Sequence, residues 1–101
     1  MSKKYRDRAA GRSCKLMLPG VCSYDVAQTV GCHLRFFGVA GMGQKPDDIL
    51  MIDACSKCHA VLDDKSIWEK HELNWRIITM ALMFTLLERH LDGDIKLIGE
   101  K

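Results

Sequence analysis

The sequence has little of several features that would place it in other protein classes. It contains two prolines among 101 residues and no internal repeat or low-complexity tract, which argues against a repeat array or a linker and favours a single domain over residues 1–101. Its longest apolar stretch, near residues 77–87, is too short and interrupted to span a bilayer. The start, Met-Ser-Lys-Lys-Tyr-Arg, has no apolar segment of the kind found in signal peptides. We therefore expect a cytoplasmic protein with no membrane partner.

The net charge is also small, but the charged residues are unevenly distributed. The formal net charge is only +2 and 48% of the residues are hydrophobic, a balance that argues against disorder. Residues 1–15 hold six basic residues and one acid, whereas the rest of the chain is slightly acidic. We interpret residues 1–12 as a flexible or weakly helical basic arm. Such an arm could contact phosphates, and a solvated, frayed terminus is an equally good interpretation.

Cysteine, by contrast, is abundant, and four of the five cysteines form two pairs. Cys14 and Cys22 flank a Pro-Gly turn, and Cys55 and Cys58 form a C-x-x-C knuckle. In a reducing compartment thiolates at such spacings are typical of a structural zinc site and not of disulfides. Buried free thiols are the less favoured alternative. Cys32 has no partner at ligand spacing, so we predict a buried free thiol there.

The order of elements predicts an α+β fold. Residues 29–37 are rich in β-branched and aromatic residues and predict a strand, and a glycine-rich loop over 38–48 leads to a second strand over 49–54. The knuckle then opens a helix that reaches about residue 64. We therefore expect a zinc-stapled core over residues 13–64, followed by a helical part over 65–101.

Two further helices are predicted in the C-terminal part. A capping box, Ser66-x-x-Glu69, places a helix start at Ile67. A more apolar helix is expected over 77–90, ending before Gly93, and the tail over 94–101 forms an edge strand or is loose. The residues expected to face the core are Trp75, Ile78, Leu82 and Leu86.

The run from Gly31 to His59 resembles an HNH nuclease, the ββα-metal fold. It has a strand ending in histidine, a loop with two aspartates, a second strand, and Cys-x-x-Cys-His opening a helix. The sequence is still more similar to a family of small phage and prophage nucleases, which are related to the RecA-dependent nuclease of some phages. The segments that carry this resemblance are Gly11-Arg12-Ser13-Cys14, Leu18-Pro19-Gly20-Val21-Cys22, Cys32-His33-Leu34-Arg35, residues 41–48 and Ala54-Cys55-Ser56-Lys57-Cys58-His59.

The resemblance implies roles for three site residues. His33 would be the general base for water, and His59 would bind a single divalent metal, Mg²⁺ or Mn²⁺. Asp48, or less favourably Asp47, occupies the region where the family usually has asparagine. Cys32 stands where many HNH nucleases carry an acidic metal ligand. The zinc knuckle would be scaffold that fixes the helix presenting His59.

Four basic residues are candidate nucleic-acid contacts. Arg35 follows His33 by two residues and so shares its strand face, and the other three lie in the arm, the loop and the knuckle. A solvated side chain is about as good an interpretation of each. These candidates are Arg12, Arg35, Lys45 and Lys57.

Three functions follow in order of preference. The first is a metal-dependent DNA endonuclease of the HNH type in phage recombination or DNA processing within a bacterial host cell, with a recombinase filament as a further partner. The second is a non-catalytic zinc-containing nucleic-acid-binding module, which would need the cysteines but neither His33 nor His59. The third is a protein-interaction module built on the apolar helix around Trp68 and Trp75, which an exposed apolar face on residues 74–87 or dimerisation would favour.

Overall fold

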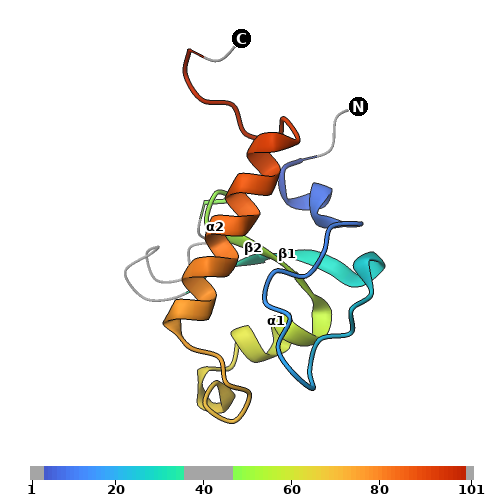
Figure 1. The fold of residues 1–101 in the computed structure, drawn as a ribbon, viewed down its shortest axis with the longest axis vertical. Coiled ribbons are helices and arrows are strands. Elements are labelled where there is room, and N and C mark those ends of the chain that lie inside the picture. The colour runs from blue at the N-terminus through green and yellow to red at the C-terminus, as the bar shows by residue number, and fades with distance from the viewer. Residues whose placement is uncertain (1–3, 36–46, 100–101) are drawn as a thin grey trace.

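The computed structural model describes residues 4–35 and 47–99, which form a small α+β fold with a two-stranded sheet and two α-helices. The α+β prediction is confirmed. Figure 1 shows the two strands at the centre of the molecule, with α2 running past them and the N-terminal segment beside the C-terminal half of α2. The elements in order are the 3-10 helices η1 (Arg6–Ala9) and η2 (Val26–Gln28), strands β1 (Thr29–His33) and β2 (Met51–Cys55), helix α1 (Ser56–Leu62), the 3-10 helix η3 (Lys65–Ile67) and helix α2 (Trp75–Leu91).

Strands β1 and β2 pair antiparallel, with Gly31 opposite Asp53 and His33 opposite Met51. A side chain at position 31 would meet the Met51 side chain, because a Cβ there would lie 2.8 Å from Met51 Cε. Glycine therefore allows Met51 to pack across β1.

Both strands are shorter or shifted relative to the sequence prediction. β1 ends at His33, four residues before the predicted end, and residues 36–37 lie outside the described residues. β2 starts at Met51 and not at residue 49, because Asp47 holds a turn just before it. The Ile49 amide donates to the Asp47 carboxylate at 3.0 Å, and the Leu50 amide donates to the Asp47 carbonyl at 2.9 Å.

The outer edge of β2 is covered by two neighbouring segments. The Lys15 amide donates to the Asp53 carbonyl at 2.8 Å, and the Asp53 amide donates to Thr85 Oγ1 of α2 at 3.1 Å. All five β2 residues are consequently buried. The Lys15 segment and α2 thus satisfy the backbone groups that would otherwise be left unpaired at this edge.

Helix α2 begins and ends at recognisable caps. The Asn74 side chain accepts a hydrogen bond from the Ile77 amide at 3.0 Å, and Gly93 adopts a φ of +85° after the last turn. The helix prediction over 77–90 is confirmed and extended by two residues at the start and one at the end.

The buried face of α2 was only partly predicted. Ile78 is buried, as expected, and Leu82 and Leu86 are half-buried. Trp75 was expected in the core and is 51% exposed, so this prediction is wrong. The fully buried positions are Ile78, Ala81, Thr85 and Arg89, and the last two of these are polar.

The capping-box prediction at Ser66 is wrong in the same region. Asp64 is the capping residue, because its carboxylate accepts from both the Ser66 amide and the Ser66 hydroxyl. The result is the short η3 turn, after which Trp68 is buried and donates its indole N–H to the Leu62 carbonyl at 3.2 Å. The described part of the tail, residues 94–99, forms no strand. The edge-strand alternative predicted for the tail is therefore excluded for these residues.

The core lies between the sheet, α1 and the first half of α2, and it includes most of the cysteines. Its buried members are Cys14, Leu16, Leu18, Cys32, Leu34, Ile52, Ala54, Cys55, Cys58, Val61, Leu62, Trp68, Leu73, Ile78 and Ala81. Cys32 is a fully buried free thiol, as predicted. Of the helices that the structure describes, none is both long and apolar enough to cross a membrane.

Candidate metal centre and paired histidines

The four predicted zinc ligands come together in the structure. The Sγ atoms of Cys14, Cys22, Cys55 and Cys58 all lie within 4.8 Å of one another, and those of Cys22 and Cys55 are 3.9 Å apart. A tetrahedral zinc with bonds of about 2.3 Å places its sulfur ligands about 3.8 Å apart. The cluster therefore fits a four-coordinate structural zinc, the cofactor expected from the sequence.

Backbone amides around the cluster point at the sulfurs. The amides of Met17, Tyr24 and Cys58 lie 3.3–3.4 Å from the sulfurs of Cys14, Cys22 and Cys55, respectively. Two of these amides belong to residues with positive φ, 43° at Met17 and 56° at Tyr24, so the backbone is held in the left-handed region to aim them. Such amides stabilise thiolates, which is the form that binds metal.

The acidity of the cluster follows from hydrogen bonds among its thiols. The Cys58 thiol donates to Cys14 and, with help from backbone amides, lowers the pKa of Cys14 to about 4. Its role as the donor raises the pKa of Cys58. These hydrogen bonds therefore favour the thiolate form of Cys14, which is the form that binds metal.

His33 lies at the end of β1 and is paired with Asp48. The His33 Nε2 and Asp48 Oδ1 atoms are 2.8 Å apart, and the His33 side chain is 5% exposed. The structure thus brings together two of the residues singled out from the sequence. Asp47, the less favoured alternative to Asp48, uses its carboxylate in the turn before β2.

His59 lies in α1 and is paired with Asp63 one turn later. The His59 Nε2 and Asp63 Oδ2 atoms are 3.0 Å apart, and both side chains are partly exposed. The sequence analysis did not single out Asp63. The signal was present, because residues four apart on a helix share a face and His59-x-x-x-Asp63 has that spacing.

The two histidine pairs do not merge into one metal-ligand cluster. Within residues 4–35 and 47–99, the four cysteines are the one group of three or more ligand side chains whose donor atoms lie within 4.8 Å of one another. His33 and His59 are therefore parts of two separate pairs.

The candidate phosphate contacts differ in their surroundings. Arg35 is exposed and lines a polar cavity with Leu62, Asp63 and Lys65, next to the His59 pair. Lys57 is exposed on α1. Lys45 lies outside the described residues.

Comparison with known proteins assigns the chain to a family. The family model described as "Putative nuclease YbcO" matches residues 3–85. The chain belongs to the YbcO family. The match takes in all four cysteines of the cluster and both histidine pairs.

Two curated proteins and one solved structure are similar to this chain. Two proteins named "Putative nuclease YbcO" come from Escherichia coli K12 and from Enterobacteria phage 82. Each is 39% identical to this chain over 61 residues, which cover 60% of this chain and 64% of the relative. The matched region thus spans less than two thirds of either YbcO relative. A solved structure of a putative bacteriophage protein from E. coli K-12 has a TM-score of 0.66 and 26% identity, and covers 89% of this chain and 100% of its own.

The N-terminal part of the YbcO-family match is folded onto the body. η1 packs against β1, and Ala9 is buried. Arg12, predicted to contact nucleic acid, instead makes ion pairs with three carboxylates at 2.6–3.1 Å, and its side chain is only 11% exposed. The carboxylates are those of Glu88, Asp92 and Asp94 at the end of α2. Of the two alternatives for this segment, flexible or weakly helical, the described residues 4–12 therefore match the second, since they contain η1 and pack against the body.

The sequence analysis also missed a buried ion pair between β2 and α2. Arg89 donates two hydrogen bonds to Asp53, from Nε at 2.9 Å and from Nη2 at 2.6 Å. Burial alone would lower the pKa of Arg89, but the hydrogen bonds to Asp53 outweigh it and raise that pKa. The signal was a single acid in an apolar strand and an arginine near the end of an apolar helix.

Proposed function

We propose that this protein is a metal-dependent endonuclease of the HNH type that hydrolyses DNA phosphodiester bonds in phage recombination or DNA processing. The observation that carries the proposal is the His33–Asp48 pair at 2.8 Å. Membership of a family described as a nuclease, together with a structural zinc cluster, supports it.

The pairing determines which nitrogen of His33 would act. A carboxylate can only accept a hydrogen bond, so Nε2 carries the proton shared with Asp48 and Nδ1 keeps a free lone pair. Nδ1 would take a proton from the attacking water, and the Asp48 carboxylate would stabilise the imidazolium that forms. Burial of His33 would limit competition from bulk water.

His59 and Asp63 are the residues that would hold the divalent metal. One imidazole nitrogen and one carboxylate oxygen suit Mg²⁺ or Mn²⁺ with water in its remaining positions. When bound, the metal would neutralise charge on the phosphate and on the leaving oxygen. Asp63 thereby joins the site residues predicted from the sequence.

A base and a metal site can act on the same phosphate without sharing ligands. A base lies about 3 Å from its water, the water about 3 Å from the phosphorus, and a phosphoryl oxygen about 2 Å from the metal. Base and metal ligands therefore need not lie within one ligand cluster. Arg35 and Lys57 would contact flanking phosphates, and such contacts favour the DNA backbone over base sequence.

The proposal is tested by cleavage of supercoiled, linear and single-stranded DNA by zinc-loaded protein, with Mg²⁺ or Mn²⁺ and with EDTA. We expect cutting that needs the divalent metal, a loss of at least about 10²-fold in His33→Ala, and a raised metal requirement in His59→Ala. His71→Ala is the matched control, because His71 is outside both pairs. Undiminished cutting by His33→Ala would remove His33 from the mechanism.

The cysteine cluster supports a second candidate, a non-catalytic zinc module that binds nucleic acid. Neither His33 nor His59 belongs to the cluster. Salt-dependent DNA binding that is unchanged in His33→Ala and His59→Ala, with no cleavage under any metal condition, would favour this candidate over the nuclease.

A further inference from the structure

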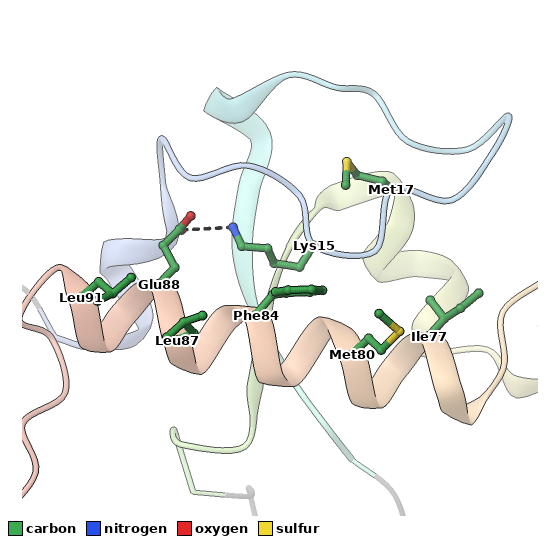
Figure 2. Close-up of a pocket in the computed structure, with 8 residues that line it drawn as sticks. All are labelled: Lys15, Met17, Ile77, Met80, Phe84, Leu87, Glu88 and Leu91. Carbon is green, nitrogen blue, oxygen red and sulfur yellow. Dashed lines mark hydrogen bonds and ion pairs between the residues drawn. The ribbon is translucent and has the colours of Figure 1, made fainter.

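Helix α2 carries a second apolar stripe on the side away from its buried residues. Ile77, Met80, Phe84, Leu87 and Leu91 recur at spacings of three, four, three and four, the pattern of a helix that packs against another helix. We call these five residues the α2 seam. Figure 2 shows their side chains along one side of the helix. Four of them are strongly exposed: Met80 42%, Phe84 52%, Leu87 52% and Leu91 74%.

The seam is open to solvent and is not covered by the described part of the chain. Together with Met17 and Lys15 of the N-terminal segment it lines a groove of about 530 Å³ (Figure 2). Lys15 and Glu88 are joined by an ion pair at 3.1 Å on one side of the groove. The fully buried positions of α2, such as Ile78 and Ala81, already supply its contact with the core.

We propose that the α2 seam binds the seam of a second copy of this chain, with the two α2 helices antiparallel about a two-fold axis at Phe84. The seam is centred on Phe84, since Ile77 and Leu91 both lie seven residues away. A two-fold interface needs a surface that is complementary to itself, and a stripe whose two ends lie equally far from its central residue can meet that need.

The charges at the two ends of the seam suit the antiparallel arrangement. Arg76 and Asp92 are both exposed and lie eight residues on either side of Phe84. The Asp92 carboxylate pairs with Arg12 through one oxygen, and the side chain stays 54% exposed, so it can also accept from a second copy. Antiparallel packing brings Arg76 of one copy to Asp92 of the other twice per dimer. It also sets the helix dipoles in opposite directions.

The exposed apolar area is sufficient for a small dimer interface. Met17 and Met83, 53% and 62% exposed, lie beside the four strongly exposed seam residues. If each of these six side chains buries about 100 Å², each copy contributes about 600 Å², which is the lower end of stable interfaces. All six side chains are large and uncharged, and the centres of protein interfaces are likewise depleted of charged residues.

Sedimentation equilibrium of zinc-loaded protein over a range of concentrations tests the proposal. We expect a monomer–dimer equilibrium, and a dimer dissociation constant raised at least about 100-fold in Phe84→Glu, since the change occurs twice at the centre of the interface. Leu91→Glu should act in the same direction at a site too exposed to affect folding. Val26→Glu is the matched control, because Val26 is 48% exposed and outside the seam.

Charge reversal tests the antiparallel arrangement. Arg76→Asp and Asp92→Lys should each weaken the dimer, and the double variant should regain most of the loss. Zinc content and circular dichroism of each variant report that the monomer is intact. Wild-type protein that stays monomeric at all concentrations, even if another protein binds the seam, overturns the proposal. So does a dimer that persists in both Phe84→Glu and Leu91→Glu, and a double reversal without recovery overturns the antiparallel geometry.

Discussion

Asp53 of β2 and Arg89 of α2 form a two-pronged ion pair, and neither side chain is exposed to solvent. The Arg89 guanidinium also lies 4.2 Å from the centre of the Tyr5 ring and donates to the Tyr5 carbonyl. The pair therefore joins three segments that are distant in sequence: the N-terminal segment, the second strand and the last turns of the long helix.

Removing one member of this pair should destabilise the protein strongly. Asp53→Asn or Arg89→Met leaves a buried charge without its counter-charge, so we expect a loss of about 3–5 kcal/mol in the free energy of unfolding, measured by urea denaturation. Lys70→Met, at an exposed lysine outside the pair, is the control and should change stability by no more than about 0.5 kcal/mol. A loss below about 1 kcal/mol in both pair variants would mean that the pair contributes little.

Loss of one zinc ligand should unfold much of the molecule. Cys58 is fully buried and belongs both to the sulfur cluster and to the core. Cys58→Ser should therefore lower bound zinc well below one per chain, measured by elemental analysis, and abolish the cooperative thermal transition. Cys32→Ala is the control, since Cys32 is buried but outside the cluster, and it should retain zinc. A stable, zinc-loaded Cys58→Ser variant would refute the structural role.

Asp48 should matter for cleavage more than its neighbour does. If His33 is the base, Asp48→Ala removes the side chain that orients it and stabilises its charged form, and the cleavage rate should fall about 10²–10⁴-fold with folding unchanged. Asp47→Ala is the control, because the Asp47 carboxylate contacts a backbone amide of the turn. Equal losses in the two variants would point to damage to the turn and not to the base.

Acid should weaken the contact between Glu88 and the N-terminal segment. Burial alone would raise the pKa of Glu88, but hydrogen bonds from Lys15 and Arg12 outweigh it and lower that pKa. A lowered folded-state pKa contributes stability above the ordinary glutamate value of about 4.3, and this contribution is lost as pH falls through the folded value. Wild-type protein should therefore lose more unfolding free energy than Glu88→Gln between pH 6 and pH 3.5. Parallel curves would exclude this contribution.

The features that could be predicted from the sequence are those with local signals. The cysteine spacings and the Pro-Gly turn predicted the sulfur cluster. The predicted bounds of α2 lie within two residues of the observed ones. Trp75 was misplaced because α2 has apolar residues on both its buried and exposed sides, and periodicity alone cannot tell which stripe faces the core. At Ser66 the capping-box pattern was overridden by Asp64, which lies two residues closer to α1 and accepts the hydrogen bond from the Ser66 amide.

Interactions between distant segments could not be predicted in this way. Charge counting assigned Arg12 to a free arm, because it cannot detect that the end of α2, more than 70 residues away, supplies three carboxylates. The Asp53–Arg89 pair depends likewise on how β2 and α2 meet in space. Family resemblance alone singled out His33 and Asp48 together. The sequence of the loop between them does not tell how far apart the two side chains lie.

The covered edge of β2 affects how this protein can associate with others. An open strand edge offers unpaired amides and carbonyls to any extended chain, and such edges are common starting points for aggregation. Here the Lys15 amide and the Thr85 hydroxyl already occupy the outer edge of β2 at Asp53. Strand addition at that position is therefore blocked, whereas the α2 seam on the neighbouring helix stays open to a partner.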